Sequence, residues 1–279
     1  MIMGRVSRLL LRLGGYLGRL VYFLGVRRRV TLEGLTRAFP EWSSAERRRL
    51  ARACYSHLGR GLVEILMVRR MTNGRLDELV SFEGYERYQA ANALGKGVVV
   101  AMAHFGNWEL LGRACARRGM RFGVIVRTLR GRFNRALTSW REEIGMGLLR
   151  DRGSTSDALR RLRSGETLAV VVDQNMRASR GVFVSFFGTL ACTTPAAAVF
   201  SLRTGAPLLA VFPVRQLDGT HRIQWEGPFL PPKGLRGHEA VVALTQELTR
   251  AVERAVRAHP EQWYWLHRRW KTRPQEVPV

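Results

Sequence analysis

The sequence predicts an α/β domain in which helices flank a central, mostly parallel sheet. After the first 26 residues, short apolar segments of strand length alternate with segments of helical periodicity, and this alternation is typical of layered α/β folds. The chain has 279 residues, of which 46% are hydrophobic, and it contains no internal repeat or convincing linker. We therefore expect one large core preceded by an N-terminal segment.

Residues 1–26 are predicted to form an amphipathic, membrane-associating helix. Its basic residues share one helical face and apolar residues cover the remainder; the arginines are Arg5, Arg8, Arg12 and Arg19. A signal peptide fits poorly because the basic residues recur throughout, and Arg19 interrupts the apolar run that a spanning helix needs. A helix lying in the membrane interface is preferred, and a helix packed on a soluble core is the alternative. Residues 27–279 then form the folded domain.

The elements of this domain are predicted from capping signals and apolar periodicity. Ser43-Ser44-Ala45-Glu46 is a capping box, so a long helix is expected to begin there and to reach Met67. The other predicted helices are 85–94, 108–118, 133–144, 157–162, 195–203 and 239–258. The predicted strands are 98–102, 123–126, 168–172, 182–186, 208–214 and 222–225, so the sheet is expected to begin near Val98.

The charge balance is strongly basic, with 46 Lys and Arg against 22 Asp and Glu and a net charge of +24. Nucleic acid, an anionic bilayer or an acidic protein would each satisfy such a surface. No zinc finger, RNP-type motif or basic zipper is present, so nucleic-acid binding is not expected.

Three cysteines, Cys54, Cys115 and Cys192, have neither C-x-x-C spacing nor an even count. A disulfide framework or zinc site is therefore not expected, and we predict buried, reduced thiols.

The segment His104-Phe105-Gly106-Asn107-Trp108-Glu109 joins a predicted strand to a predicted helix. Functional sites of α/β sheets collect at the carboxyl ends of strands, where this segment lies. A break at Gly106-Asn107 could fold His104 back toward Glu109, although the two would diverge on one continuous helix. His104 would then act as general base toward a hydroxyl attacking an acyl carbonyl, with Glu109 orienting the ring. On spacing alone, the better supported interpretation is structural: His104 provides hydrogen bonds within a loop, and Glu109 caps a helix.

Several motifs together resemble the bacterial lipid A biosynthesis acyltransferases, the secondary lauroyl and myristoyl transferases of lipopolysaccharide assembly. The segment 104–109 is similar to the family's H-x4-E signature. Other similar blocks are Asp173-Gln174, the segments 182–188 and 193–196, and the C-terminal segment 265–274, which is the most specific of them. The early segment 35–40, followed by Ser43 and a long helix, is also similar, so the resemblance covers nearly the whole chain.

This resemblance implies a glycerol-phosphate-acyltransferase-like fold, a basic membrane anchor at the cytoplasmic face of the bacterial inner membrane, and no metal or redox cofactor. It implies acyl transfer from acyl carrier protein or a coenzyme A thioester to a hydroxyl of a lipid A precursor. His104 becomes the base and Glu109 its partner. The supporting, substrate-binding residues are taken to be Asp173 and arginines chosen among Arg127, Arg141, Arg150, Arg152, Arg268 and Arg269.

Two alternatives from other classes remain, a nucleic-acid-binding protein and a noncatalytic membrane-binding protein. Neither explains a histidine and a glutamate placed after a strand. A hydrolase is not supported because no G-x-S-x-G motif is present. Among acyltransferases, the alternative acceptor is another glycolipid or a phospholipid.

Overall fold

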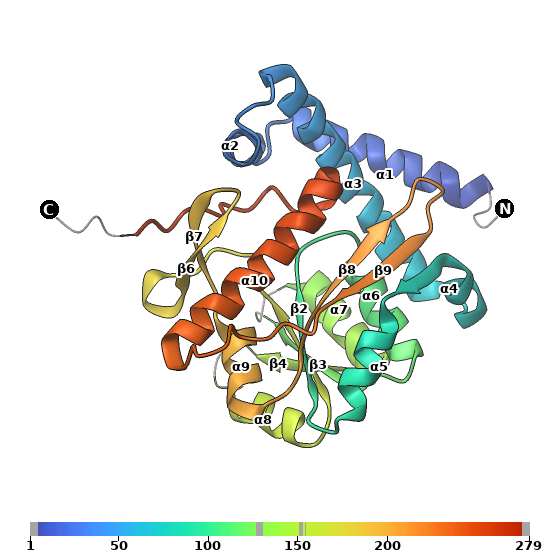
Figure 1. Cartoon of the computed structure of the whole chain (residues 1–279). Coiled ribbons are helices and arrows are strands. Elements are labelled where there is room, and N and C mark those ends of the chain that lie inside the picture. Colours follow the sequence, from blue (N-terminus) through green and yellow to red (C-terminus); the bar gives the residue numbers. More distant parts are fainter. Residues whose placement is uncertain (1–4, 127–130, 151–152, 154, 275–279) are drawn as a thin grey trace, which may run out of the picture.

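The computed structural model describes residues 5–126, 131–150, 153 and 155–274, and it has the predicted α/β architecture (Figure 1). Within these residues the central sheet has seven strands in the order β1-β9-β8-β2-β5-β3-β4, and β6 and β7 form a separate hairpin. The strands are β1 (Val80–Glu83), β2 (Val98–Met102), β3 (Phe122–Val126), β4 (Met146–Arg150), β5 (Thr167–Val171), β6 (Val182–Phe186), β7 (Thr189–Thr193), β8 (Leu208–Arg215) and β9 (His221–Glu226).

Pairing in the central sheet is parallel except between β8 and β9, which are antiparallel. β2 lies between β8 and β5, and its register with β5 pairs Met102 with Val171. Because parallel strands in this register end side by side, the residues that follow them reach the same edge of the sheet. His104 follows β2 and Asp173 follows β5, so the topology brings these two residues together.

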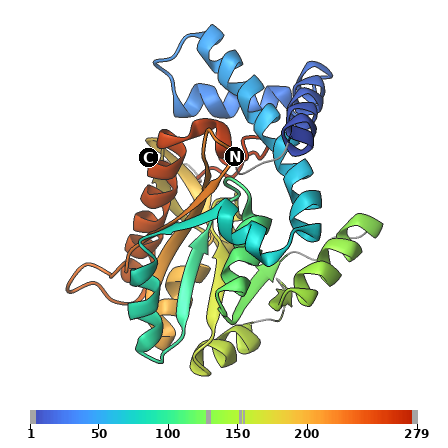
Figure 2. The same cartoon turned by 90° about the vertical axis from the view of Figure 1, so that its right-hand side faces the viewer.

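The helices cover both faces of the sheet (Figure 2). They are α1 (Arg5–Phe23), α2 (Arg28–Ala38), α3 (Ser44–Arg70), α4 (Asn73–Leu79), α5 (Tyr85–Ala93), α6 (Trp108–Arg117), α7 (Arg132–Glu143), α8 (Thr155–Arg163), α9 (Ala196–Thr204) and α10 (Gly237–Ala258). Alternate strand residues enter two apolar layers: Val99 packs in the layer that holds α8, α9 and α10, and Val98 and Val100 pack in the layer that holds α5 and α6. Burial on both faces explains why β2 is an uninterrupted apolar run.

The predicted capping box at the start of α3 is confirmed. The Ser43 hydroxyl accepts from the Glu46 amide at 3.2 Å, and the Ser43 amide donates to the Glu46 carboxylate at 2.7 Å. These reciprocal bonds satisfy two backbone donors at the start of the helix.

The sequence missed some elements and misplaced one. It did not predict α2, α4, β1, β4 or β7. The sheet begins at β1 rather than near Val98, because β1 has only four residues and gives no apolar run of its own. The predicted strand 182–186 exists as β6 but lies outside the central sheet, in a hairpin held on α10 by a pair of bonds between the Gln246 side chain and the Ser185 backbone.

The N-terminal helix α1 crosses α3 at backbone contact distance. A Cβ atom added at Gly18 would lie 1.9 Å from the Tyr55 carbonyl oxygen, and one added at Gly59 would lie 2.0 Å from the Gly14 carbonyl oxygen. Glycine is therefore required on both helices, and no side chain separates them at this point. Leu11 and Tyr22 complete the buried stripe of α1.

The remainder of α1 faces outward and is largely apolar. Its exposed large apolar residues are Leu9, Leu10, Leu13, Tyr16, Leu17, Leu20, Val21 and Phe23, and Leu24 and Val26 follow in the turn. One stripe of α1 thus packs on the domain, as the alternative interpretation expects, and the rest is uncovered. The position of α1 in a membrane interface stays a prediction. Among the described helices, none alone has the length and apolarity to cross a bilayer, whereas Ser7–Phe23 and Arg28–Ala38 meet these criteria as a pair bent by 93°.

All three cysteines are buried and unpaired, as the sequence predicts.

Candidate active site

The centre of the site is a hydrogen-bonded pair of His104 and Asp173. The His104 ring nitrogen Nδ1 lies 2.8 Å from Asp173 Oδ1, and the His104 backbone amide donates to Asp173 Oδ2 at 2.9 Å. The Trp263 indole also donates to Oδ2, at 2.8 Å. The Asp173 side chain is 2% exposed, so three donors replace the water that a carboxylate would otherwise bind.

Electrostatics fix the protonation of this pair. Burial raises the pKa of Asp173, but the His104 charge and the hydrogen bonds from His104 and Trp263 outweigh it and hold that pKa below its ordinary value. Burial lowers the pKa of His104, and the charge and hydrogen bond of Asp173 overcome this, so the His104 pKa lies above its ordinary value. The ionised carboxylate accepts a hydrogen bond from the proton on Nδ1. This leaves Nε2 of the neutral ring as the basic atom. Nε2 lies 3.2 Å from the Gln174 amide nitrogen.

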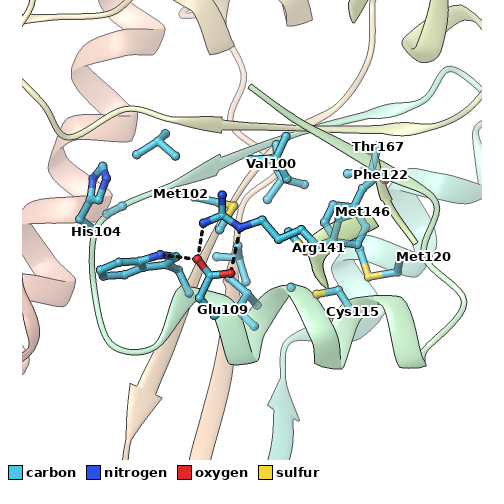
Figure 3. A pocket seen from close by; sticks show the side chains of 18 of the residues that line it. Val100, Met102, His104, Glu109, Cys115, Met120, Phe122, Arg141, Met146 and Thr167 are labelled. Atoms are coloured by element: carbon cyan, nitrogen blue, oxygen red, sulfur yellow. Dashed lines mark hydrogen bonds and ion pairs between the residues drawn. The ribbon is translucent and has the colours of Figure 1, made fainter. Parts of the chain in front are cut away.

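Glu109 has a different partner from the one expected. Its carboxylate binds Arg141 of α7 through both oxygens, with Arg141 Nε at 3.0 Å from Oε2, and it also accepts from the Trp108 indole at 3.1 Å (Figure 3). We expected Glu109 to hold the His104 ring. In the structure the ring is held by Asp173 instead, and Glu109 binds Arg141. The cause is topological, because β5 delivers Asp173 directly beside His104.

The turn between β2 and α6 is held from several sides. Gly106 has φ +56°, and a Cβ atom there would lie 1.8 Å from the Pro213 carbonyl oxygen, so glycine is required for both conformation and space. The Gly106 amide donates to the Gln262 carbonyl, and the Tyr264 amide donates to the His104 carbonyl, both at 2.9 Å. The C-terminal segment thus lies along the turn and fixes the His104 backbone.

A second buried charged cluster lies behind this turn. The Glu64 carboxylate of α3 accepts hydrogen bonds from Arg215 Nε at 2.7 Å and from the side-chain amide of Asn107 at 3.2 Å. Asn107 in turn caps α6 by accepting from the Leu110 amide. Burial raises the pKa of Glu64, but the neighbouring His221 and Arg215 reverse this and hold it at about 2. This cluster connects α3 to the first turn of α6, which carries Glu109.

His57 and His221, to which the sequence assigned no role, lie beside Glu64. Burial lowers the pKa of His57 to about 4, so its ring is neutral at physiological pH. The two histidines belong to the buried support of the turn.

A mostly apolar cavity of about 330 Å³ opens beside His104. Figure 3 shows His104 at one end, the Glu109–Arg141 pair along the wall, and Cys115 and Met120 at the opposite end. The remaining wall is lined by alternate residues of β2 and β5 and by apolar side chains of α6, β3 and β4: Val100, Met102, Leu111, Gly112, Phe122, Val124, Met146, Ala169 and Val171. Its mostly apolar lining and its polar end at His104 have the character of a site for an extended hydrocarbon group.

The remaining predicted site residues either lie outside the described part of the chain or do not line the His104 cavity. Arg127 and Arg152 lie outside the described residues, and the Arg150 side chain is also outside them. Arg268 is exposed, away from the His104 cavity. Arg269 is 1% exposed and donates to the carbonyls of Gln174 and Cys192, so its contacts are structural rather than directed at a ligand. Burial lowers its pKa to about 10.

Sequence reasoning missed the positions of Gln174 and Trp263 in the site. Gln174 follows Asp173 directly, and its place at the end of a buried strand was the available signal. Trp263 is 1% exposed, and its indole donates to Asp173 from the C-terminal segment, far away in the sequence. In the described part of the chain, no group of three or more His, Cys, Asp or Glu residues is placed to hold a metal ion.

The chain is similar to known acyltransferases over most of its length. A family model described as bacterial lipid A biosynthesis acyltransferase matches residues 4–272. The Escherichia coli K12 lipid A biosynthesis lauroyltransferase is 28% identical over 96% of this chain and 87% of its own length, and the palmitoleoyltransferase of the same organism is 27% identical over 90% and 81%. A Mycobacterium tuberculosis phosphatidylinositol mannoside acyltransferase is 26% identical over 70% of this chain and 61% of its own length.

The His104–Asp173 pair makes a prediction for the His104 ring. In the wild-type protein, an NMR titration should give a His104 pKa above the ordinary value of about 6.5. Asp173→Asn removes the charge that stabilises the imidazolium and should bring the pKa down, whereas Glu109→Gln should shift it less because Glu109 binds Arg141. A His104 pKa that Asp173→Asn leaves unchanged would contradict the proposed electrostatics.

Proposed function

Because this chain belongs to the bacterial lipid A biosynthesis acyltransferase family, we propose that it transfers a fatty acyl group from a thioester to a hydroxyl of a lipid A precursor, with His104 as the general base. The acyl donor is acyl carrier protein or coenzyme A. The observation that carries the proposal is a histidine whose Nδ1 is held by a buried carboxylate and which lines the apolar cavity.

The chemistry follows from the free Nε2 atom. The acceptor hydroxyl takes the place of the Gln174 amide and gives its proton to Nε2 as its oxygen attacks the thioester carbonyl. The tetrahedral intermediate collapses when the C–S bond breaks, and the leaving thiolate takes the proton back from His104. Asp173 remains ionised throughout, holds the ring orientation and stabilises the transient imidazolium.

We assign Glu109 and Arg141 to charge stabilisation. Glu109 holds the Arg141 guanidinium along the cavity wall by a two-oxygen contact, which restricts its rotation. A cation held there would stabilise the negative oxygen that forms during attack, at no cost of reorganisation. Glu109 is then a positioning residue that acts through Arg141.

The cavity would hold the acyl chain. Its walls are mostly apolar from Met102 to Met120, so burial of each methylene group contributes about 0.8 kcal/mol. With the carbonyl carbon at His104, the far end of the cavity sets the longest chain that fits.

A second lipid is also a candidate for the acyl acceptor. The similarity to a phosphatidylinositol mannoside acyltransferase favours a different glycolipid hydroxyl as the alternative to a lipid A precursor. Mass spectrometry of the lipids of the native host, with and without this protein, distinguishes the two because the lost acyl group identifies both acceptor and chain. Loss of an acyl group from lipid A supports the first acceptor and excludes the second.

The exposed side of α1 would hold the enzyme on a membrane. We assign the enzyme to the cytoplasmic face of the bacterial inner membrane. The exposed apolar residues of α1 suit the interior of a lipid layer, and the neighbouring arginines suit its headgroups. Anionic headgroups also attract a chain with a net charge of +24.

The catalytic assignment predicts that His104→Ala lowers kcat by roughly a hundredfold or more, because the acceptor hydroxyl then lacks a base. His238→Ala is the matched control, since His238 is exposed at the start of α10. Acyl transfer measured with radiolabelled donor, together with thermal melting, separates loss of chemistry from loss of fold. Near-normal turnover by a folded His104→Ala protein refutes the assignment.

The acyl cavity predicts opposite changes in chain length for two substitutions. A Cβ atom at Gly112 would lie 2.9 Å from the Met146 sulfur, so Gly112→Val should push Met146 into the cavity and favour shorter chains, whereas Met146→Ala should favour longer ones. Exclusion of two methylenes should lower kcat/KM for the longest accepted chain roughly tenfold. Competition between donors of different length gives the ratio, and an unchanged ratio in both variants excludes this cavity as the acyl site.

The membrane assignment predicts that replacing Leu13, Leu17 and Leu20 by serine weakens vesicle binding by roughly a hundredfold or more, because each leucine loses burial in the lipid. The melting temperature should not fall, since these side chains are exposed. The control replaces Leu94, Leu217 and Leu230, which are exposed outside α1. Equal binding by both triple variants in a sedimentation assay would place the membrane contact elsewhere.

A further inference from the structure

A strongly basic groove of about 500 Å³ lies between α2 and the C-terminal segment 267–273, outside the His104 cavity. Figure 1 shows α2 at the same end of the molecule as α1, with the C-terminal segment passing close to it. The groove is lined by five exposed or half-buried cations and one carboxylate. The cations are Arg29, Arg37, Arg268, Lys271 and Arg273, and the carboxylate is Glu33.

Most of these cations have no acidic partner among the described residues. Glu33 forms its ion pair with Arg29, at 2.7 Å. Within the described ranges, no ion pair includes Arg37, Arg268, Lys271 or Arg273. Four like charges around one groove repel one another, and an anion bound between them would remove that repulsion.

Of these four cations, Arg37 is the best placed to bind an anion in the groove. Its guanidinium lies over the Trp270 ring, 5.5 Å from the centroid, which fixes its position at the wall of the groove. Burial lowers the pKa of Arg37 and the positive charge of Arg273 lowers it further, whereas the negative charge of Glu33 raises it. Arg37 and Arg273 therefore act on one another across the groove.

Both walls of the groove are packed or hydrogen-bonded against the rest of the fold. A Cβ atom at Gly34 of α2 would lie 3.3 Å from the Trp265 ring, so α2 packs closely on the C-terminal tryptophans. The other wall is tied to the residues after β5, because the Thr272 amide donates to Asn175 Oδ1 at 2.9 Å and the Thr272 hydroxyl donates to the Met176 carbonyl at 2.7 Å. Because the backbone of each wall is held in this way, the cations that it carries are close to one another before a ligand binds.

The groove is connected through neighbouring residues to His104 on one side and to α1 on the other. His267 lines the groove and accepts from the Asn175 amide at 2.8 Å, and Asn175 follows Gln174, which contacts His104. On the other side, α2 follows α1 after a short turn. A lipid whose chains enter the bilayer at α1 would present its headgroup to this groove.

We propose that the groove between α2 and segment 267–273 binds a phosphomonoester of a lipid headgroup. A phosphomonoester carries close to two negative charges at neutral pH and offers three acceptor oxygens, which matches several guanidinium donors better than a singly charged diester does. The inference deepens the proposed acyl transfer, since the phosphate would belong to the acceptor, but binding can be measured without turnover.

The test compares two double variants of the full-length protein with the same loss of charge. Arg37→Gln with Arg273→Gln alters the groove, and Arg163→Gln with Arg203→Gln alters exposed arginines of α8 and α9, at the opposite end of the molecule (Figure 1). Vesicles of phosphatidylcholine carry either phosphatidate, a phosphomonoester, or phosphatidylglycerol, a phosphodiester, at equal surface charge. The wild type and the α8–α9 variant should prefer phosphatidate, and the groove variant should lose that preference, by roughly tenfold or more.

A second arm identifies the source of the phosphate. Inorganic phosphate, compared with chloride at equal ionic strength, should raise the melting temperature of the wild type but not of the groove variant if the site also takes soluble phosphate. Retained phosphatidate preference with no response to inorganic phosphate assigns the site to lipid alone. Response to inorganic phosphate without phosphatidate preference overturns the lipid assignment, and equal behaviour of the groove variant and the wild type in both arms overturns the site.

Two controls keep the proposal separate from folding and from catalysis. Should Arg37→Gln lower the melting temperature, Arg268→Gln with Lys271→Gln alters the same groove through exposed side chains. His104→Ala should bind phosphatidate vesicles like the wild type, because it lies outside the groove. If acyl transfer fails to appear while the phosphatidate preference depends on the groove, the proposed function is wrong and the phosphate site stands.

Discussion

The burial of one carboxylate organises the candidate active site of this molecule. Asp173 accepts from the His104 ring, the His104 backbone and the Trp263 indole, so it ties together β2, β5 and the C-terminal segment. An ionised group removed from water is tolerated only when its oxygens are fully hydrogen-bonded, and each of these donors is therefore held in place by the cost of leaving the charge unsatisfied. The same bonds set the tautomer of His104 and keep Nε2 available.

Much of the fold could be predicted from periodicity, because its longer helices and its buried strands are strongly patterned. The strand 98–102 and the helix start at Ser43 are correct to within a residue. β1 and β4 were missed because short edge strands are stabilised by their pairing partners rather than by their own apolar content. β6 was predicted as a strand, but its hairpin was missed because the partner strand β7, only two residues further along the chain, was not predicted.

Only part of the candidate site could be predicted, and its pairings could not. The family resemblance pointed to His104, Glu109, Asp173 and, among several arginines, Arg141, but the sequence paired His104 with Glu109. The parallel register of β2 with β5 places Asp173 nearer, and α7 supplies Arg141 to Glu109 instead. Arg268 and Arg269 are neighbours with opposite environments, one exposed and one buried on backbone carbonyls, and no property of the sequence Arg-Arg distinguishes them.

The close glycine crossing of α1 and α3 couples the position of α1 to the turn between β2 and α6, which carries His104. Gly59 and Glu64 lie on the same helix, and Glu64 holds Asn107 at the start of α6. Because backbone meets backbone at the crossing, no change of rotamer can absorb a sliding motion of α1. A bilayer of different thickness or curvature would therefore be met by raising, lowering or tilting the whole domain, and the depth of His104 relative to the lipid surface would follow.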